Sequence, residues 1–578
     1  MKSKQHIATI AVTLALMLPN VVRAQDIKQI AESDPLIITG AVGTQNTYYH
    51  SSLGSGYASP LNNSVYANLN ISVYGFSMPF SFYYSNDDTS FTYPQFSFNL
   101  QPHYKNWTGY IGESAISYSQ YVMSMAFNGV GVEYNDGKRL RFGAWYGRLR
   151  KAVNDDPTDP YARTPEYKRM GWGFKLGYGN SQNFLDLYFL KAYDQLKSID
   201  ERWRTAVTPK DNLVVGLKAI TTPLKVLSLS VNAAASVMSS DAQADIIEVD
   251  QARRWDKVFD VRYSTLARFA GDANVTLTLP SLTATASYRM IQPDYGSLGT
   301  YYLSNNLHSL GLTLGTYLFK KVSISATFSG QEDNLSKRQL YTTRGLVYSV
   351  NASPRFGKHF TLAAGYNGYT QTQSDGTARV NDTIRVNRIM EGFTLSPSFN
   401  FGGEVLSHQI SLSASLTNNK DRNRFATGES DVKALALGTS YNIGIKPWEM
   451  DITTSLNHTV SKGYRSEYRS DILSLTTSRS FLKDDNLNVS LTGSLCYNEI
   501  KYQSKNLSMG ADMSIGYTLK EVHSFSLSAG INKYGDVNLV KKKSGLDATD
   551  ISASFNYNYT FSLVEIKKKG EKKEQNKM

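Results

Sequence analysis

The C-terminal part of the chain contains an unbroken alternation of apolar and polar residues. From Ile551 to Leu563, apolar side chains occupy every second position, and Ser, Asn or Thr fills each position between them. Successive side chains of a β-strand point to opposite faces, so the pattern predicts a strand with one apolar and one polar face. Strands of globular proteins are usually about 5 to 6 residues long, whereas a tilted strand needs roughly 9 to 11 residues to cross a bilayer. The stretch therefore predicts the last strand of a transmembrane β-barrel.

The same alternation recurs along the chain between tight turns. From Pro223 onward, eight short turns, the first at Pro223 itself, alternate with longer polar loops and predict sixteen strands. Before Pro223, ten strands are expected near Leu36–Tyr49, Val65–Tyr74, Met78–Ser85, Phe96–Pro102, Trp107–Gly112, Phe127–Tyr134, Leu140–Leu149, Met170–Tyr178, Phe184–Ala192 and Leu213–Thr221. The predicted fold is all-β, a single large antiparallel transmembrane β-barrel over residues 36–563. It has about 26 strands (range 22 to 26), short periplasmic turns and longer extracellular loops.

The N-terminus has the features of a secretory signal peptide. Lys2 and Lys4 precede an apolar stretch from Ile7 to Leu18, and a small-residue site ends at Ala24. We expect residues 1–24 to be this signal, 25–35 a short periplasmic segment and 564–578 a Lys-rich periplasmic tail. No later segment approaches the roughly 18 apolar residues of a transmembrane helix, so any crossing must use strands. The expected location is the outer membrane, after export.

Composition agrees with a barrel wall and argues against other classes. The chain has 38 Tyr, whose apolar ring and polar tip suit membrane interfaces. The net charge of +12 includes three cations of the signal and several of the tail, so the body carries too weak a bias to predict nucleic-acid binding. Cys496 is the single cysteine, which excludes an internal disulfide.

Four stretches of sequence resemble a family of secreted outer-membrane β-barrel proteins of Bacteroidota. They are Asn68–Phe82 (NLNISVYGFSMPFSF), Arg141–Arg150 (RFGAWYGRLR), Gln292–Asn306 (QPDYGSLGTYYLSNN) and Gln331–Lys358 (QEDNLSKRQLYTTRGLVYSVNASPRFGK). The resemblance covers roughly residues 36–401 and implies location and fold, with no activity or site residue to transfer. One departure from the common outer-membrane pattern is that seventeen residues follow Phe561, where an aromatic terminus is expected.

Charged residues within predicted strands are the first set of candidate functional residues. If Phe174, Leu176 and Tyr178 face lipid, Lys175 faces the lumen, and the same parity argument applies to the other charges on strands. A lipid-facing Lys or Arg at mid-depth would cost about 2 to 4 kcal/mol, which favours the inward assignment. The candidate lumen-facing charges are Glu133, Arg141, Lys175, Asp186, Lys218 and Arg289. They either filter ions and polar solutes or form salt-bridged pairs that stiffen the wall.

A second set of candidate residues is a loop cluster that could bind an anionic surface sugar or a partner, with solvated loop charge as the ordinary alternative. It consists of Glu332, Asp333, Lys337, Arg338 and Arg344. Enzymatic function is not expected: His308 adjoins Ser309, but neighbours in a strand point to opposite faces and cannot form a catalytic dyad with each other. The sequence predicts no cofactor and no metal site. Glycines 171, 173, 177 and 179 lack the dinucleotide-binding context and are expected to allow bending and close packing.

The sequence leaves three functional hypotheses. The first is a conduit for polar solutes or exported material, including a form gated by a partner. The second is a non-conducting scaffold subunit of an outer-membrane assembly or secretion complex, and the third is a surface adhesin. Expected partners are outer-membrane lipids, the barrel assembly machinery, and a periplasmic or lipoprotein partner in or below the lumen, with the Lys-rich tail as a candidate contact.

Overall fold

The computed structural model describes residues 36–54, 60–74, 76–86, 96–116, 118–155, 163–247, 258–538 and 543–566. The predicted signal peptide, the segment before the first strand and residues 567–578 of the predicted tail lie outside the described residues. Three single-turn 3-10 helices, η2 (Glu201–Trp203), η3 (Lys446–Trp448) and η4 (Lys483–Asp485), interrupt what is otherwise strand, turn and loop. None of the described helices is long and apolar enough to cross a membrane.

The strands follow one another along the chain. They are β1 (Leu36–Ser51), β2 (Leu61–Val73), β3 (Phe76–Ser85), β4 (Phe96–Leu100), β5 (His103–Tyr104), β6 (Trp107–Ser114), β7 (Phe127–Asn135), β8 (Leu140–Arg150), β9 (Arg169–Gly179), β10 (Phe184–Asp194), β11 (Asp211–Leu224), β12 (Leu227–Ser239), β13 (Thr265–Thr278), β14 (Leu282–Ile291), β15 (Leu307–Leu318), β16 (Val322–Asp333), β17 (Tyr341–Phe356), β18 (Phe360–Asp375), β19 (Asn387–Gly402), β20 (Leu406–Asp421), β21 (Val432–Ile445), β22 (Met450–Lys462), β23 (Glu467–Phe481), β24 (Leu487–Ile500), β25 (Ser504–Leu519), β26 (His523–Asn538) and β27 (Lys543–Ile566).

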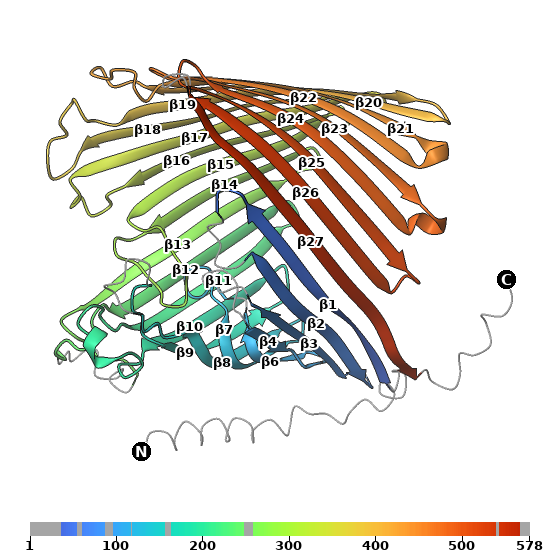
Figure 1. Cartoon of the computed structure of the whole chain (residues 1–578). Coiled ribbons are helices and arrows are strands. Elements are labelled where there is room, and N and C mark those ends of the chain that lie inside the picture. Colours follow the sequence, from blue (N-terminus) through green and yellow to red (C-terminus); the bar gives the residue numbers. More distant parts are fainter. Residues whose placement is uncertain are drawn as a thin grey trace.

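The strands form one closed antiparallel barrel (Figure 1). Each strand pairs with its neighbour in sequence, and β1 pairs with β27 from Leu36 opposite Ile566 to Ser51 opposite Asp550. Strands β4 and β5 both pair with β3 on one side and β6 on the other, so they are two pieces of one wall strand. The 27 segments therefore make 26 wall strands, the number expected from the sequence.

The two ends of the barrel differ in their connections. Turns of a few residues join the strands at the right of Figure 1, and several of them place non-glycine residues such as Lys320, Asp484 and Lys520 at positive φ. The longer loops gather at the left, including the described parts of the connection between β12 and β13, residues 240–247 and 258–264. These ends are called the turn end and the loop end below.

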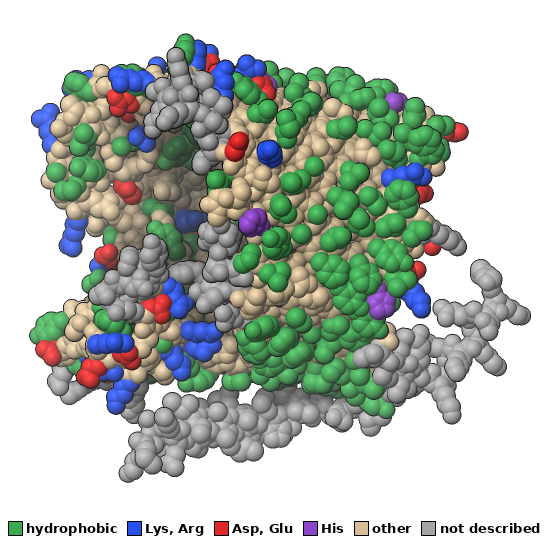
Figure 2. Space-filling model, in the orientation of Figure 1, with side chains coloured by type: hydrophobic (Ala, Val, Ile, Leu, Met, Phe, Trp, Pro, Cys, Tyr) green, Lys and Arg blue, Asp and Glu red, His purple; other side chains and the backbone are tan. Residues whose placement is uncertain are grey.

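The outer face is apolar because alternate side chains of each strand point outward. On β9, Phe174, Leu176 and Tyr178 are 42%, 51% and 66% exposed, whereas the intervening Lys175 is buried. Figure 2 shows apolar side chains spread over this face, with charged side chains mostly toward the ends and a hollow at the loop end. Aromatic side chains contact one another across strands near the turn end, including Phe360 with Phe399 and His523 with Tyr559, each pair with ring centroids 4.6 Å apart. This face has the apolar band and aromatic girdle of a membrane barrel.

Many strands begin or end a few residues from the expected boundary, as β2 does at Leu61 and β11 at Leu224, and two departures have a clear physical reason or consequence. The strand expected at Phe96–Pro102 ends at Leu100 and resumes at His103, because Pro102 has no N–H to donate to the ladder. The last strand is longer than Ile551–Leu563: β27 begins at Lys543 and pairs with β1 up to Ile566, so the first three residues of the expected tail belong to the wall.

Candidate functional site

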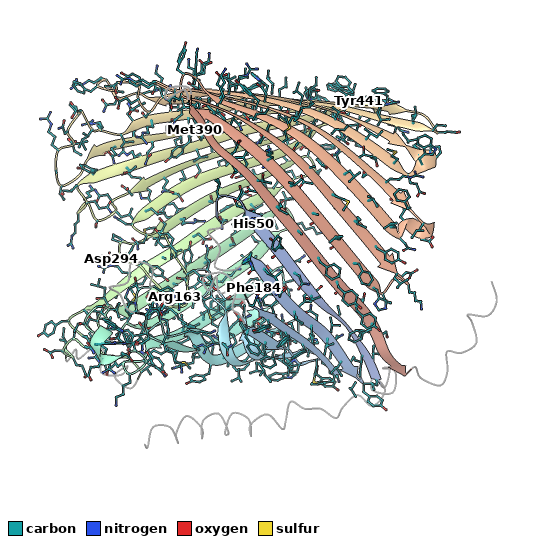
Figure 3. The ribbon with its side chains drawn as sticks, in the orientation of Figure 1. His50, Arg163, Phe184, Asp294, Met390 and Tyr441 are labelled. Atoms are coloured by element: carbon teal, nitrogen blue, oxygen red, sulfur yellow. The ribbon has the colours of Figure 1, made fainter. Side chains whose placement is uncertain are left out.

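Two connections at the loop end fold into the barrel and fill part of its lumen. They are residues 118–126, between β6 and β7, and residues 292–306, between β14 and β15, here called the first and second inner segments. Tyr121, Val122, Tyr295 and Leu298 from these segments are buried in the hydrophobic core. The core lies inside the barrel, against inward-facing residues of the strands from β6 to β14. Figure 3 shows the side chains packed densely around Phe184, at the start of β10, in this part of the wall.

The two inner segments are held together by hydrogen bonds to backbone carbonyls. The Tyr295 hydroxyl donates to the Tyr121 carbonyl at 2.8 Å, and the Ser297 hydroxyl donates to the Val122 carbonyl at 2.6 Å. In the other direction, two backbone N–H groups of the first segment donate to the Gly299 carbonyl at 3.0 Å. Segments about 170 residues apart in sequence thus form one unit, since the Tyr295–Tyr121 bond spans 174 positions.

Polar side chains attach this unit to the wall. The Ser119 hydroxyl donates to Asn232 Oδ1 on β12 at 2.6 Å, and the Tyr121 hydroxyl donates to Asp272 Oδ1 on β13 at 2.7 Å. Asn212 on β11, which is fully buried, accepts from the Leu298 N–H at 3.0 Å. A buried polar group is costly unless it has a partner, so these bonds fix where the inner segments lie.

The phenols of Tyr121 and Tyr295 stay neutral. Burial raises the pKa of Tyr121 above its ordinary value, and the hydrogen bond to Asp272 raises it further. Burial likewise raises the pKa of Tyr295, with a smaller contribution from Tyr121. These two buried phenols therefore add no charge to the lumen at physiological pH.

Four of the six candidate lumen-facing charges form two ion pairs on the inner face. Lys175 Nζ lies 2.7 Å from Glu133 Oε1, and Arg141 Nη2 lies 3.3 Å from Asp186 Oδ2. The side chains of Lys175 and Asp186 are 5% and 1% exposed. Each carboxylate also accepts a phenol hydrogen bond, from Tyr110 to Glu133 at 2.9 Å and from Tyr188 to Asp186 at 3.1 Å. These contacts favour the stiffening role over the filtering role for these four residues.

The other two candidates, Lys218 and Arg289, lie apart from these pairs. Lys218 on β11 is half-buried beside Asp186, its cross-strand neighbour, and Arg289 on β14 is exposed opposite Asp272. No carboxylate of the described residues lies within 4 Å of either cation. Of the six, these two are the cations that a solute in the lumen can reach without breaking an ion pair.

Inward-facing glycines on β9 make room for these side chains. A Cβ at Gly177 would overlap the Asp186 carboxylate, and a Cβ at Gly173 would lie 2.8 Å from the Trp145 indole nitrogen. The role expected for these glycines, close packing, is the one this geometry shows.

The wall from β15 to β27 presents a different inner surface. Within the described residues, the core cluster ends at Leu298, before β15 begins. The inward positions of the later strands carry hydroxyls and amides that bond across strands, as in the pairs Ser455–Ser474 at 2.7 Å and Thr476–Thr492 at 3.1 Å. This side of the lumen is polar, mostly uncharged and not covered by the inner segments.

The candidate loop cluster is spread over two strands and a turn. Glu332 and Asp333 end β16 and Arg344 lies on β17, so their assignment to a loop was wrong; the ladder continues further than the polar composition indicated. Arg344 Nε lies 2.7 Å from Glu332 Oε2, and Asp333 Oδ1 accepts from the Thr343 N–H. Lys337 and Arg338 are exposed in the turn, and the described residues bring no carboxylate within 4 Å of them. The acidic members are therefore already paired within the hairpin.

The sequence reasoning did not identify the inner segments. The longer connections that follow β8 and β10 would be the obvious candidates for inward folding, but their described parts bond to each other, as the Asp200 N–H does to Asn154 Oδ1 at 2.9 Å. A signal existed in the cluster Ile116, Tyr118, Tyr121, Val122 and Met123, which is apolar without strand alternation. Such a cluster in a connection must be covered by something. Among the described residues, no group of three His, Cys, Asp or Glu side chains could hold a metal.

Comparison with known proteins leaves the function to be argued from this geometry. No family model and no curated protein matches the chain, so membership of the Bacteroidota family stays a prediction. Similar solved structures include OccAB2 of Acinetobacter baumannii (TM-score 0.30, 10% identity, 66% of this chain and 96% of that chain). Others are Pseudomonas aeruginosa OpdK with vanillate (0.31, 10%, 61% and 93%) and OccK9, or OpdG (0.30, 9%, 91% and 98%). A likeness this low carries no conclusion about substrate or mechanism.

Proposed function

We propose that the protein is an outer-membrane β-barrel that conducts polar solutes along one side of its lumen. The observation that carries this proposal is the division of the inner wall. The inner segments cover the strands from β6 to β14, whereas the hydroxyl and amide surface from β15 to β27 stays uncovered within the described residues. Barrels of 16 to 18 strands already leave an aqueous channel, and a barrel of 26 strands is wider.

The placement in a membrane rests on the outer face. Outward positions are apolar along the middle of the strands, and aromatic rings gather near the turn end. An apolar surface of this extent is costly in water and is the surface that lipid tails cover. The proposed orientation puts the short turns in the periplasm and the longer loops outside the cell.

The proposed cargo is polar, without a strong preference for either sign of charge. Each inner ion pair is neutral, and the exposed lumen-facing charges include both the cation Arg289 and the carboxylate Asp512, which lies opposite Thr492 in the inward row. Most of the passage is lined by Ser, Thr and Asn, which exchange hydrogen bonds with a solute without binding it tightly.

Single-channel recording of the purified chain in planar bilayers tests the proposal. Steady conductance supports it, and Arg289→Gln, which removes an exposed lumen cation, should shift the ion preference toward cations without changing the single-channel conductance by more than about twofold. Glu332→Gln, outside the proposed passage, is the matched control. A folded barrel that gives no current refutes the conduit and favours the scaffold.

Cys496 offers an independent test. Its neighbour Leu495 on β24 is exposed outward, so Cys496 faces the lumen, where Asn498 Nδ2 lies 3.3 Å from its sulfur. A small hydrophilic maleimide should label this thiol in the folded barrel. In unlabelled protein, a polymer-bearing maleimide attached to the same thiol should reduce the current. Labelling by the polymer without loss of current would place the passage elsewhere.

A further inference from the structure

The outer face of β20 to β26 carries a group of cations close to the loop end. These strands lie side by side along the top and front of the barrel in Figure 1. Exposed apolar residues such as Leu416, Leu435 and Leu473 show which alternate positions of these strands point outward. The charged residues occupy those same outward positions. The seven cations, here called the cationic patch, are Lys420, Lys433, Lys462, Arg469, Lys501, Lys505 and Lys533.

The patch has fewer acids than bases. Within the described residues of these strands, three carboxylates share the surface: Glu467, Asp471 and Glu499. Glu467 pairs with both Lys462 at 3.4 Å and Lys501 at 3.1 Å. Three carboxylates cannot neutralise seven cations, so the surface keeps an excess of positive charge.

Two of the lysines directly face each other. Lys433 on β21 lies opposite Lys462 on β22 in an outward row, and no carboxylate of the described residues lies within 4 Å of Lys433. Like charges at directly opposite positions destabilise a sheet. An anion that bridges both ammonium groups would remove this repulsion.

The patch lies at the membrane boundary. Charged side chains on the lipid face are most costly at the bilayer midplane and tolerated near the interfaces. Lys433 and Lys462 are near the loop ends of their strands, whereas the aromatic girdle marks the opposite interface. The cations therefore lie at the depth of lipid headgroups.

An apolar groove runs over the same strands below the patch. Its floor is made by the small residues Gly493, Ala511, Ala529 and Ala553, which sit on β24 to β27. Larger side chains border it, including Leu475 and Met513, and its volume is about 620 Å³. The groove and the patch share β23 to β26, so a chain lying in the groove points toward the cations.

We propose that this surface binds a phosphorylated lipid of the leaflet at the loop end. The headgroup phosphate bridges the lysines of the patch, Lys433 and Lys462 in particular, and an acyl chain lies along the groove. This inference rests on the proposed placement in a membrane but not on conduction. Phosphate is the matching anion because it presents several acceptor oxygens to separate cations at once.

Native mass spectrometry of the full chain in detergent tests this binding. The probe is a diphosphorylated lipid A, and the same lipid without its phosphates is the comparison. The triple variant Lys433→Gln, Lys462→Gln, Lys505→Gln should bind the phosphorylated probe at least about tenfold more weakly. The matched control, Lys320→Gln, Lys321→Gln, Lys358→Gln, removes three exposed cations at the turn end and should bind as the wild type does.

Further variants and conditions separate headgroup, chain and function. Ala511→Phe fills the groove and should weaken binding of the probe while leaving the patch intact. Equal affinity for both lipids, or unchanged affinity in the lysine triple variant, would overturn the proposal. Conductance should be the same in all these variants, because the proposed lipid surface lies outside the lumen. A wild-type barrel that carries no current but still binds the probe would therefore refute the proposed conduit and leave the lipid-binding proposal standing.

Discussion

The Lys175–Glu133 pair allows the two roles of the inner charges to be separated by measurement. Removing one member of a buried ion pair leaves the other uncompensated, at a cost of about 3 to 5 kcal/mol. The Lys175 side chain is 5% exposed and that of Glu133 is 19% exposed. The cost of Glu133→Gln should fall at the upper end of that range because this change leaves the more deeply buried lysine without a partner. Lys175→Met should fall at the lower end, since Glu133 keeps its bond from Tyr110.

The double variant Glu133→Leu, Lys175→Met should recover most of this loss and lie within about 1 kcal/mol of the wild type. The assay is urea unfolding in detergent micelles followed by the fluorescence of the chain's six tryptophans. Glu332→Gln breaks the exposed pair with Arg344 and serves as the control, with an expected cost below about 1 kcal/mol. Single variants at the inner pair that also cost less than about 1 kcal/mol would refute the stiffening role.

Three further predictions concern the inner segments, the β9 glycines and one turn. Tyr121→Ala should remove about 3 to 5 kcal/mol of packing from the inner segments and raise the single-channel conductance; an unchanged conductance would mean that these segments do not border the passage. Gly177→Ala, whose Cβ overlaps a neighbouring carboxylate, should cost about 1 to 3 kcal/mol in the urea assay, whereas Gly315→Ala, with open space around it, should be neutral. The pKa of Asp136 is lowered because the backbone N–H of Arg139 and two neighbouring N–H groups donate to its carboxylate. Its stabilisation is therefore complete above the unfolded pKa of about 3.9 and lost as the pH falls through the lower folded value. The difference in unfolding midpoint between wild type and Asp136→Ala should disappear in acid, and a difference that grew in acid would contradict this assignment.

Alternation was sufficient to predict the wall, because outward positions at mid-depth are mostly apolar and inward positions are free to be polar. Phe174, Lys175 and Leu176 have the parity that the sequence indicated. Alternation does not determine the register, that is, how neighbouring strands are offset along their length. Parity places Lys175 and Glu133 on the same face, but their contact depends on how β7, β8 and β9 are offset against one another. The ion pairs could not be predicted from the sequence for that reason.

The inner segments were beyond sequence reasoning on different grounds. Tyr121 and Tyr295 meet only because the barrel has curved back on itself between β6 and β14, and no local pattern encodes that approach. The apolar character of their neighbours indicates burial but not the surface that provides it. The same limit applies to the hairpin of Glu332 and Arg344, where polar composition predicted a loop although cross-strand pairing continued.

The seam between β1 and β27 has a consequence for the order of assembly. The bond from the Tyr66 hydroxyl to Asn558 Oδ1 joins residues 492 positions apart, so the wall cannot close until the last strand has arrived. Bringing such distant ends together costs about 5 to 6 kcal/mol in chain entropy, because the cost of closing a loop grows with the logarithm of its length. The many residue pairs of the seam form together and offset this cost. The core around the inner segments, by contrast, is built from residues 110–298 alone. The first half of the chain can thus pack as an open, curved sheet with its own interior, and the strands added later extend that sheet until its two edges meet.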